Sequence, residues 1–306
     1  MKRSFELRET ACPLCGARSE QEQVELYPAT FSEEHIAAHT FSARRNPDKV
    51  HYRMVRCLQD GMVRSNPVLE SKILNKLYAK STVEYGSEEK NLISSYLPQL
   101  ESVISRLPKS AKMVEVGCGS GFMLQALKEQ NYPFVFGVEP SKSARNMAGE
   151  HIQKSIINQP LNDKLFKRKS LDFIFFFQTL DHIPEPNTFL RSCYNALKPG
   201  GFIFSLHHNL IALPARLLGE KSPIVDIEHT HLYTPATSKL LFERNGFMVK
   251  KVWTPKNKIS MQHLLKLLPL PNELKSRMSK AAIVSRVLAQ SLWLDLGNIC
   301  IVGQKK

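Results

Sequence analysis

Apolar runs and helical repeats alternate through the middle of the chain. Continuous apolar stretches bounded by turn residues predict buried parallel strands at 113–116, 134–138, 173–177 and 202–206. Helical spacing predicts helices at 122–129 and 188–197, and a further helix that begins after Thr234 and ends at Gly246. Strands that alternate with helices are typical of an α/β fold with helices on both faces of a mostly parallel sheet.

Two further strands are expected at 247–253 and 298–303, where they would close the sheet. The segment between them, about 261–294, is basic, rich in leucine and of helical character. We expect this helical insertion to form a cap, because the domain itself can bury its leucines. A helix lying on a membrane surface is the alternative.

The chain before the first sheet strand divides into two parts. Helical spacing at 69–77 and 92–107 predicts a helical linker or cap over 67–110. Asn66 and Pro67 mark the end of a different segment, which carries two short cysteine motifs. The expected organisation is a small module at 1–66, the helical linker at 67–110 and the sheet domain at 111–306.

The small module opens with a C-x-x-C turn at Cys12 and Cys15, in which two thiolates can face one ion. The same spacing recurs at Cys57 and Asp60. Three thiolates and a carboxylate form an acceptable zinc set, so the module resembles a zinc ribbon that holds a structural Zn²⁺. Histidines that could supply the fourth ligand instead are His51, His39 and His35. A module that folds without metal is the other interpretation.

Charge and cysteine content restrict the function classes without selecting one. The chain carries 42 Lys+Arg and 28 Asp+Glu, a net charge of +14, and residues 251–306 supply +8 of it from 10 basic and 2 acidic residues. This excess is compatible with nucleic acid, an anionic membrane or a phosphorylated substrate. No apolar run reaches the roughly 20 residues of a membrane helix, and the N-terminus lacks a signal-peptide core. A cytoplasmic location with cysteines as thiols or metal ligands is therefore expected.

A glycine loop follows the first predicted strand and opens the next helix. Gly117, Gly119 and Gly121 let the backbone approach a ligand closely, and the helix N-terminus offers free N–H groups. Position 122 is Phe where a dinucleotide fingerprint has its third glycine, so NAD is disfavoured. Glu139 ends the second strand about twenty residues later, where a carboxylate can accept both ribose hydroxyls.

These segments resemble the class I S-adenosylmethionine-dependent methyltransferases of the type 11 and type 23 groups. The motifs that carry the resemblance are VEVGCGSG at 114–121, GVEPS at 137–141, LDFIFFFQTLDHIPEP at 171–186, LKPGG at 197–201 and HLYTPATSKLLFERNGF at 231–247. The resemblance implies a Rossmann-like sheet of seven strands, S-adenosylmethionine as cofactor and methyl transfer as activity. It covers the segment from 114 to 247 and leaves both ends of the chain less well described.

The resemblance also implies roles for individual residues. The glycines would back the methionine part of the cofactor, Glu115 would set the loop through hydrogen bonds, and Glu139 would hold the ribose. The cofactor residues implied in this way are Glu115, Gly117, Cys118, Gly119, Gly121, Glu139, Pro140 and Gln178. Gln178 would lie beneath the transferred methyl, and the adenine would lie near 158–161.

Histidines are the candidates for chemistry on the acceptor. His182 follows the fourth strand and is either a proton acceptor or the residue that caps the next turn. His207 and His208 follow the fifth strand, and His229 and His231 precede the Thr234 cap, so all four could line one pocket. Imidazole suits the removal of a proton from a hydroxyl or amine. The alternative is that these histidines have a structural role and support a lid over the pocket through hydrogen bonds.

The leading hypothesis is methyl transfer to an O, N or C nucleophile of a small acceptor, anionic or of carbohydrate type, such as a phosphorylated or nucleotide-linked sugar. Methylation of RNA bases is the second hypothesis, motivated by the basic charge. The nearly neutral head, with 10 basic and 9 acidic residues over 1–66, and the lack of an aromatic and basic stripe argue against it. A non-catalytic scaffold is the third, and the intact glycine loop argues against that.

Overall fold

A seven-stranded sheet forms the centre of the computed structural model, which describes residues 7–41, 48–81, 88–268, 270–271, 273–277 and 290–306, without the side chains of 38 and 39. Its strand order is β12-β15-β10-β9-β6-β7-β8. The strands are β6 (Met113–Val116), β7 (Val135–Val138), β8 (Ile156–Ile157), β9 (Leu171–Phe177), β10 (Leu197–His208), β12 (Phe247–Trp253) and β15 (Asn298–Lys305).

The direction of the strands separates the sheet into a parallel part and an antiparallel edge. β6 to β10 pair in parallel, whereas β15 runs antiparallel between β10 and the edge strand β12. The chain moves from β6 outward to β8 and then returns to β9 on the other side of β6. This reversal places the ends of β6 and β9 at the switch point where open α/β sheets bind ligands. The predicted seven-stranded α/β fold is confirmed.

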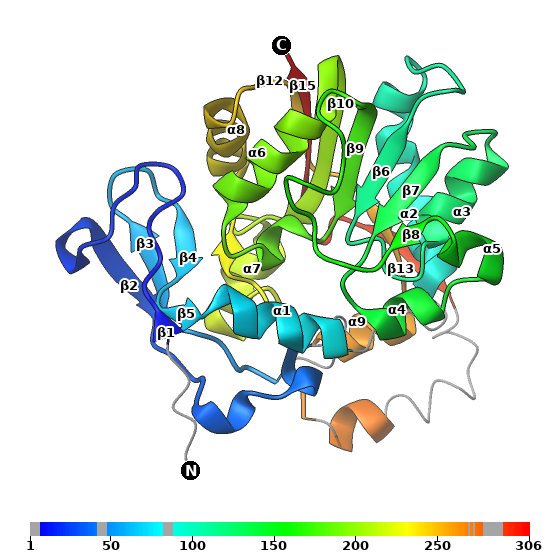
Figure 1. Cartoon of the computed structure of the whole chain (residues 1–306). Coiled ribbons are helices and arrows are strands. Elements are labelled where there is room, and N and C mark those ends of the chain that lie inside the picture. The colour runs from blue at the N-terminus through cyan, green and yellow to red at the C-terminus, as the bar shows by residue number, and fades with distance from the viewer. Residues whose placement is uncertain (1–6, 42–47, 82–87, 269, 272, 278–289) are drawn as a thin grey trace.

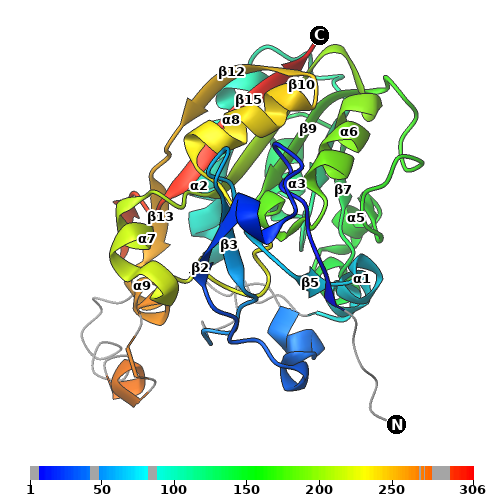
Figure 2. The same cartoon turned by 90° about the vertical axis from the view of Figure 1, so that its left-hand side faces the viewer.

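Helices cover both faces of the sheet, as Figures 1 and 2 show. The helices are α1 (Ser71–Lys80), α2 (Glu89–Ile104), α3 (Phe122–Glu129), α4 (Lys142–Asn146), α5 (Glu150–Gln153), α6 (Pro186–Ala196), α7 (Leu213–Leu218), α8 (Pro235–Arg244) and α9 (Met261–Leu267). Short 3₁₀ turns are η1 (Glu20–Glu22), η2 (Glu33–His35), η3 (Ala38–Phe41), η5 (Leu180–His182) and η6 (Gly219–Lys221).

Strand β9 shows why its sequence is apolar without interruption. Phe173 and Phe175 pack with α2 and α3 on one face, while Ile174 and Phe176 pack with α6 and α8 on the other. Alternate side chains of a strand point to opposite faces, so a strand that is covered on both sides needs an apolar residue at each position. This apolar run therefore places the carboxyl end of β9 in the interior of the molecule.

The N-terminal residues form a second sheet that includes a strand from the C-terminal half. Its order is β11-β4-β3-β2, and β1 pairs separately with β5. These strands are β1 (Leu7–Arg8), β2 (Gln23–Tyr27), β3 (Met54–Cys57), β4 (Val63–Ser65), β5 (Val68–Leu69) and β11 (His231–Leu232). Because β11 pairs with β4, the module at 1–66 is hydrogen-bonded to the segment that carries His229 and His231.

The insertion before the last strand is only partly helical. It contains α9, a helical stretch at 273–277 and the strand β14 (Ser291–Leu294), which pairs antiparallel with β13 (Asn257–Ser260) just before the insertion. The expectation of a helix as far as 294 is corrected at its end, because 291–294 is a strand; 278–289 lie outside the described residues. No helix within the described part of the chain is both long and apolar enough to cross a membrane.

Candidate active site and cysteine cluster

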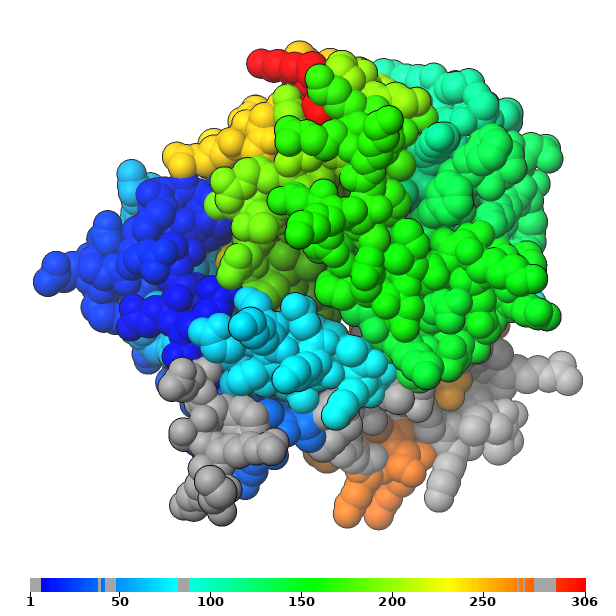
Figure 3. All heavy atoms as spheres, viewed as in Figure 1, coloured from blue at the N-terminus to red at the C-terminus, as the bar shows by residue number. Residues whose placement is uncertain are grey.

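A cavity of about 1050 Å³ lies at the carboxyl ends of the parallel strands. It is lined by residues from the ends of β6, β7, β9 and β10, and by α1, α2, α7 and α9. The atoms of α1 extend across one side of this region in Figure 3. Residues of the linker helices α1 and α2 and of α9 thus contribute to the wall of the cavity.

The glycine loop is packed tightly against the end of the neighbouring strand. Gly117 has a φ of +75°, and a Cβ added there would lie 2.5 Å from Thr179 Oγ1. The Thr179 hydroxyl lies 3.0 Å from the carbonyl of Phe177 and 3.2 Å from that of Val116, so it bridges β9 and β6. Glycine is thus needed at 117 both for its backbone conformation and for this close approach.

The other residues of the loop serve the packing of the sheet. A Cβ at Gly121 would lie 2.6 Å from Ile152 Cγ2, and one at Gly137 would collide with the Cys118 sulfur. Of the loop residues implied to bind the cofactor, Gly117 and Cys118 line the cavity, whereas Gly119 and Gly121 do not. Burial raises the pKa of the Cys118 thiol well above its usual value, so it is a packed neutral group.

Glu139 holds the glycine loop in place. Its carboxylate accepts hydrogen bonds from the backbone N–H groups of Gly119 and Ser141, both at 2.8 Å. Burial raises the pKa of this carboxyl group, and the two N–H donors oppose that shift. Glu139, which also lines the cavity, thus fixes the position of the glycine loop through the Gly119 N–H.

Glu115 has an unusual environment for a carboxylate. It is 3% exposed, lines the cavity, and its Oε2 atom has no hydrogen-bond partner among the described residues. Burial, together with the charge of Glu139, raises the pKa of Glu115 well above its usual value. A buried carboxylate without a partner is costly, and a cationic ligand would relieve that cost. The two buried carboxyl groups, Glu115 and Glu139, therefore fit a ligand that carries positive charge.

The segment expected to receive the adenine lies at the cavity wall. The Asn158 side chain donates to the carbonyls of Glu139 and Pro140, at 2.8 and 3.2 Å. Pro140 and Leu161 line the cavity. The third strand ends only one residue before Asn158, and its two-residue length explains why the sequence marks it poorly.

Gln178 follows β9 in a left-handed conformation, with a φ of +49°. Its Nε2 donates to Asn298 Oδ1 at 2.9 Å, and Asn298 donates in turn to Asn257 at 2.9 Å. Beside it, the rings of Tyr96 and Phe177 stack with centroids 4.3 Å apart. Asn298, Asn257 and Tyr96 were not predicted from the sequence, because they reach the cavity from the last strand, the hairpin and the linker helix.

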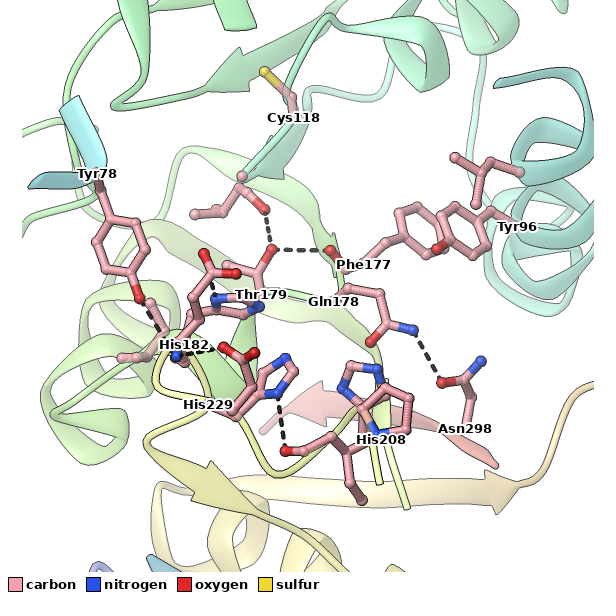
Figure 4. A pocket seen from close by; sticks show the side chains of 18 of the residues that line it. Tyr78, Tyr96, Cys118, Phe177, Gln178, Thr179, His182, His208, His229 and Asn298 are labelled. Atoms are coloured by element: carbon pink, nitrogen blue, oxygen red, sulfur yellow. Dashed lines mark hydrogen bonds and ion pairs between the residues drawn. The ribbon is translucent and has the colours of Figure 1, made fainter. Parts of the chain in front are cut away.

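Three histidines lie in a row on the other side of Gln178 from the glycine loop, as Figure 4 shows. Ring centroids are 4.8 Å apart for His182 and His229, and 4.7 Å apart for His229 and His208. All three line the cavity, and we call them the histidine wall. Since β10 adjoins β9 and β9 adjoins β6, the glycine loop, Gln178 and His208 follow one another along the sheet edge.

The remaining two histidine candidates lie away from the cavity wall. His207 is fully buried between the hydroxyls of Ser205 and Ser238, at 2.8 and 2.6 Å. His231 is buried on β11 beside Thr230. The structure thus brings His182, His208 and His229 together, while His207 and His231 are interior residues with hydrogen-bond partners.

The stability of the protein is expected to fall on acidification. Burial lowers the pKa of His207 to about 4 and that of His231 to about 3, below the ordinary histidine value of 6.5. Between pH 6.5 and about 4 the unfolded chain binds protons that the folded chain does not, so the free energy of unfolding decreases as pH falls. These two imidazoles should lower the free energy of unfolding by about 4 kcal/mol between pH 7 and pH 5. His182 and His229, whose pKa values burial also lowers, add to this fall, whereas Glu115 and Glu139, whose pKa values it raises, oppose it. Urea unfolding at the two pH values measures the sum, and a free energy of unfolding that is higher at pH 5 would contradict the prediction.

Three cysteines and an aspartate gather in the N-terminal sheet. The sulfurs of Cys15 and Cys57 are 3.4 Å apart, and Cys12 Sγ lies 3.2 Å from the Asp60 carboxylate. One ligand atom from each of the four residues lies within 4.8 Å of the others. Ligands of a tetrahedral zinc ion with Zn–S bonds of about 2.3 Å have similar separations. This cysteine cluster therefore fits a closed four-ligand site.

The surroundings of the cysteine cluster favour a negatively charged centre. Arg64 is fully buried, and burial lowers the pKa of its guanidinium while the nearby thiolates and Asp60 oppose that shift. His51, the alternative fourth ligand, lies elsewhere: its ring contacts the Tyr52 carbonyl and Glu220. His35 contacts Ser32, and the His39 side chain lies outside the described residues.

Comparison with known proteins connects this geometry to a family. The family described as Methyltransferase domain matches residues 87–252, more than half of the chain. The chain belongs to this methyltransferase family. The match confirms the predicted family, and it includes the glycine loop, Glu139 and Gln178.

Curated relatives and solved structures are similar to parts of the methyltransferase chain. A ubiquinone biosynthesis O-methyltransferase of Idiomarina loihiensis is 31% identical over 134 residues, which are 40% of this chain and 51% of the relative. One of the same name from Coxiella burnetii is 29% identical over 101 residues, 31% of this chain and 43% of the relative. The chain thus spans about half the length of the curated relatives it matches.

Two solved structures illustrate the structural comparison. The PH0226 protein of Pyrococcus horikoshii is 18% identical, with 72% of this chain and 92% of that chain covered and a TM-score of 0.49. A methyltransferase of Archaeoglobus fulgidus is 19% identical, with 72% and 98% covered and a TM-score of 0.47. The fold assignment rests on the strand order of the protein itself.

Proposed function

We propose that the protein is an S-adenosylmethionine-dependent methyltransferase that methylates a hydroxyl oxygen of a small acceptor. The observation that carries this proposal is the order of groups along the sheet edge, in which Gln178 separates the carboxylate end of the cavity from the histidine wall. The family match and the names of the curated O-methyltransferases support it. Oxygen is the proposed nucleophile because the histidines offer hydrogen-bond acceptors on that side.

The carboxylate end is proposed to hold the cofactor. Glu139 would accept the ribose hydroxyls, Pro140 and Asn158 would border the adenine, and Gly117 would allow close approach of the methionine part. Glu115 would balance the positive charge of the ligand from beneath. When bound there, S-adenosylmethionine supplies a methyl group on a positively charged sulfur.

The histidine wall and the mouth of the cavity are proposed to hold the acceptor. Much of the mouth is apolar, with Leu218, Ile224 and Leu267 among its lining residues, while Lys258 and Lys266 add positive charge. An acceptor with an apolar body, a hydroxyl and an anionic group would match this surface. The anionic character agrees with the basic C-terminal segment, and a phosphorylated or nucleotide-linked sugar remains within the proposal as a competing acceptor class.

Positioning is the main catalytic task of the chain's own residues. Tyr96 stacks on Phe177, and Asn298 fixes the Gln178 amide. Phe177 and Gln178, which lie between the two ends of the cavity, are thus held in position. Holding the hydroxyl in line with the methyl can supply several kcal/mol of barrier reduction. His182, with a pKa lowered to about 4 by burial, is a neutral hydrogen-bond acceptor near pH 7 and orients that hydroxyl.

A labelled-methyl assay tests the proposal. Phenolic acids with apolar tails, nucleotide sugars and RNA are offered separately with labelled cofactor. Label on a phenolic hydroxyl, reduced at least about tenfold by His182→Ala, is the expected result, since an unoriented hydroxyl loses about 1.4 kcal/mol or more. The matched control is His151→Gln, an exposed histidine on α5, which should retain full activity. Label on RNA alone, or none on any acceptor despite cofactor binding, would overturn the proposal.

For the N-terminal part, we propose a structural Zn²⁺ held by Cys12, Cys15, Cys57 and Asp60. The four-ligand geometry of the cysteine cluster and the buried Arg64 support it. A closed site leaves no position for substrate, so the ion would stabilise the sheet that β11 joins. The division into a module at 1–66, a linker at 67–110 and the methyltransferase domain at 111–306, and a cytoplasmic location, are part of the same proposal.

A further inference from the structure

Asp181, His208 and His229 converge from three separate segments of the chain. Asp181 belongs to η5, His208 ends β10, and His229 lies in the loop before β11. One ligand atom from each lies within 4.8 Å of those of the other two. His208 and His229 line the cavity, so this cluster, unlike the cysteine cluster, faces the space where an acceptor would bind.

His229 is held in a single tautomer. Its Nδ1 lies 2.9 Å from the carbonyl oxygen of Ile224, which can only accept, so Nδ1 donates its proton there. The lone pair is then on Nε2. A ring fixed by a backbone carbonyl on one nitrogen is the usual arrangement for a histidine that binds metal through the other.

Asp181 brings a negative charge that its protein partners do not fully satisfy. It is fully buried, and its Oδ2 atom lies 2.8 Å from His208 Nδ1 and accepts the backbone N–H of His208 at 3.1 Å. Its Oδ1 atom has no hydrogen-bond partner within the described part of the chain. An anionic group at this depth is costly unless a cation is close to it.

Gln178 adds a second unsatisfied oxygen at the neighbouring strand end. Its amide nitrogen is committed to Asn298, which fixes the orientation of the amide, and its Oε1 atom is buried without a partner among the described residues. The His182 ring also packs against His229. Asp181 Oδ1 and Gln178 Oε1 are thus two buried oxygens without a partner among the described residues, and a cation bound beside them would supply one.

We propose that Asp181, His208 and His229 bind a divalent transition-metal ion of the Zn²⁺, Mn²⁺ or Fe²⁺ type, with open coordination positions facing the cavity. Two imidazoles and one carboxylate favour these ions over Ca²⁺ and Mg²⁺, which prefer oxygen ligands throughout. Three protein ligands leave positions for a substrate oxygen, unlike the closed cysteine cluster. The role of the ion, which rests on the proposed function, is to hold the acceptor hydroxyl beside Gln178.

Titration with Co²⁺ tests the site without cofactor or acceptor. Cobalt bound by thiolates gives strong charge-transfer absorption, whereas cobalt bound by imidazole and carboxylate gives only weak visible bands, so the two clusters are distinguishable in one protein. The chelator-treated full chain is compared with Asp181→Asn, His229→Gln and the exposed-site control His151→Gln. Cofactor binding, measured separately by calorimetry, reports whether each variant remains folded.

We expect the unmutated protein to show the weak visible bands of Co²⁺ bound by imidazole and carboxylate, and the His151→Gln protein to retain them. Asp181→Asn and His229→Gln should each lower the affinity of this Co²⁺ site at least about tenfold, as loss of a ligand or of its charge does at metal sites, while the thiolate bands persist. Weak bands that are unchanged in both variants, or absent from the unmutated protein, would overturn the proposal. Because no methyl transfer is measured, a failure of the proposed activity would appear separately, as absent cofactor binding or absent product.

Discussion

Replacing Glu139 with alanine should lower the affinity of the protein for S-adenosylhomocysteine about 100-fold or more. The substitution removes the carboxylate proposed to accept two ribose hydroxyls, and each hydrogen bond to a charged group contributes about 1.5–3 kcal/mol. The substitution also removes the 2.8 Å hydrogen bond that the Gly119 N–H donates to Glu139, so the glycine loop is no longer held to the residue that follows β7. Isothermal titration calorimetry with the purified full chain measures the change.

Two further variants separate the loss of ribose contacts from a general loss of structure. Glu139→Gln keeps one acceptor oxygen for Gly119 and should bind with intermediate affinity. Glu150→Ala, an exposed carboxylate in the first turn of α5, should bind as the unmutated protein does. Unchanged affinity in Glu139→Ala would mean that this carboxylate only fixes the loop and that the ribose lies elsewhere.

Local patterns were sufficient to predict most of the central sheet. The strand at 113–116, the helix at 122–129 and the strand at 247–253 have the bounds that the sequence pattern predicts, and each follows a glycine or a lysine. The fifth strand was underestimated because β10 begins at Leu197, and Pro199, Gly200 and Gly201 lie inside it at a register shift opposite β9. Turn residues in an irregular strand cannot be distinguished from a true turn by sequence spacing.

The candidate site was harder to predict because its side chains meet across large sequence separations. Asp181 was not among the site residues predicted from the sequence, yet its carboxylate contacts His208, 27 residues further along the chain. Gln178 was placed correctly at the end of β9, but its partner Asn298 lies 120 residues away. His207 and His208 are adjacent in sequence, and the alternation of β10 sends one into the core and the other into the cavity.

The N-terminal sheet and the candidate active site are joined by a short path of hydrogen bonds. The backbone N–H of Ser65, at the end of β4, donates to the Thr230 carbonyl at 2.9 Å, and Thr230 N–H donates to the Asp181 carbonyl at 2.8 Å. The loop that carries His229 is therefore supported from the module that holds the cysteine cluster. A change in that module is expected to reach the histidine wall through this path.

Loss of metal from the cysteine cluster should therefore destabilise more than the N-terminal sheet. Treatment with a chelator, or Cys57→Ser, is expected to lower the midpoint of thermal unfolding by at least about 5 °C, since structural zinc contributes folding free energy directly and about 1 kcal/mol corresponds to 2–4 °C at this size. The transition should remain a single one, because β4 and β11 share a sheet. Scanning calorimetry of the full chain with and without chelator measures both properties.

The dependence on chelator distinguishes a metal site from buried thiols that only pack. Cys300 is a fully buried cysteine on β15, outside the cluster, so Cys300→Ala also lowers stability by removing buried volume. Chelation should lower the midpoint of thermal unfolding of Cys300→Ala by about 5 °C, as it does for the unmutated protein. Chelation should change the midpoint of Cys57→Ser very little, because this variant already lacks one of the proposed ligands. Equal chelator effects on the two variants, or none on the unmutated protein, would show that Cys12, Cys15, Cys57 and Asp60 fold together without an ion.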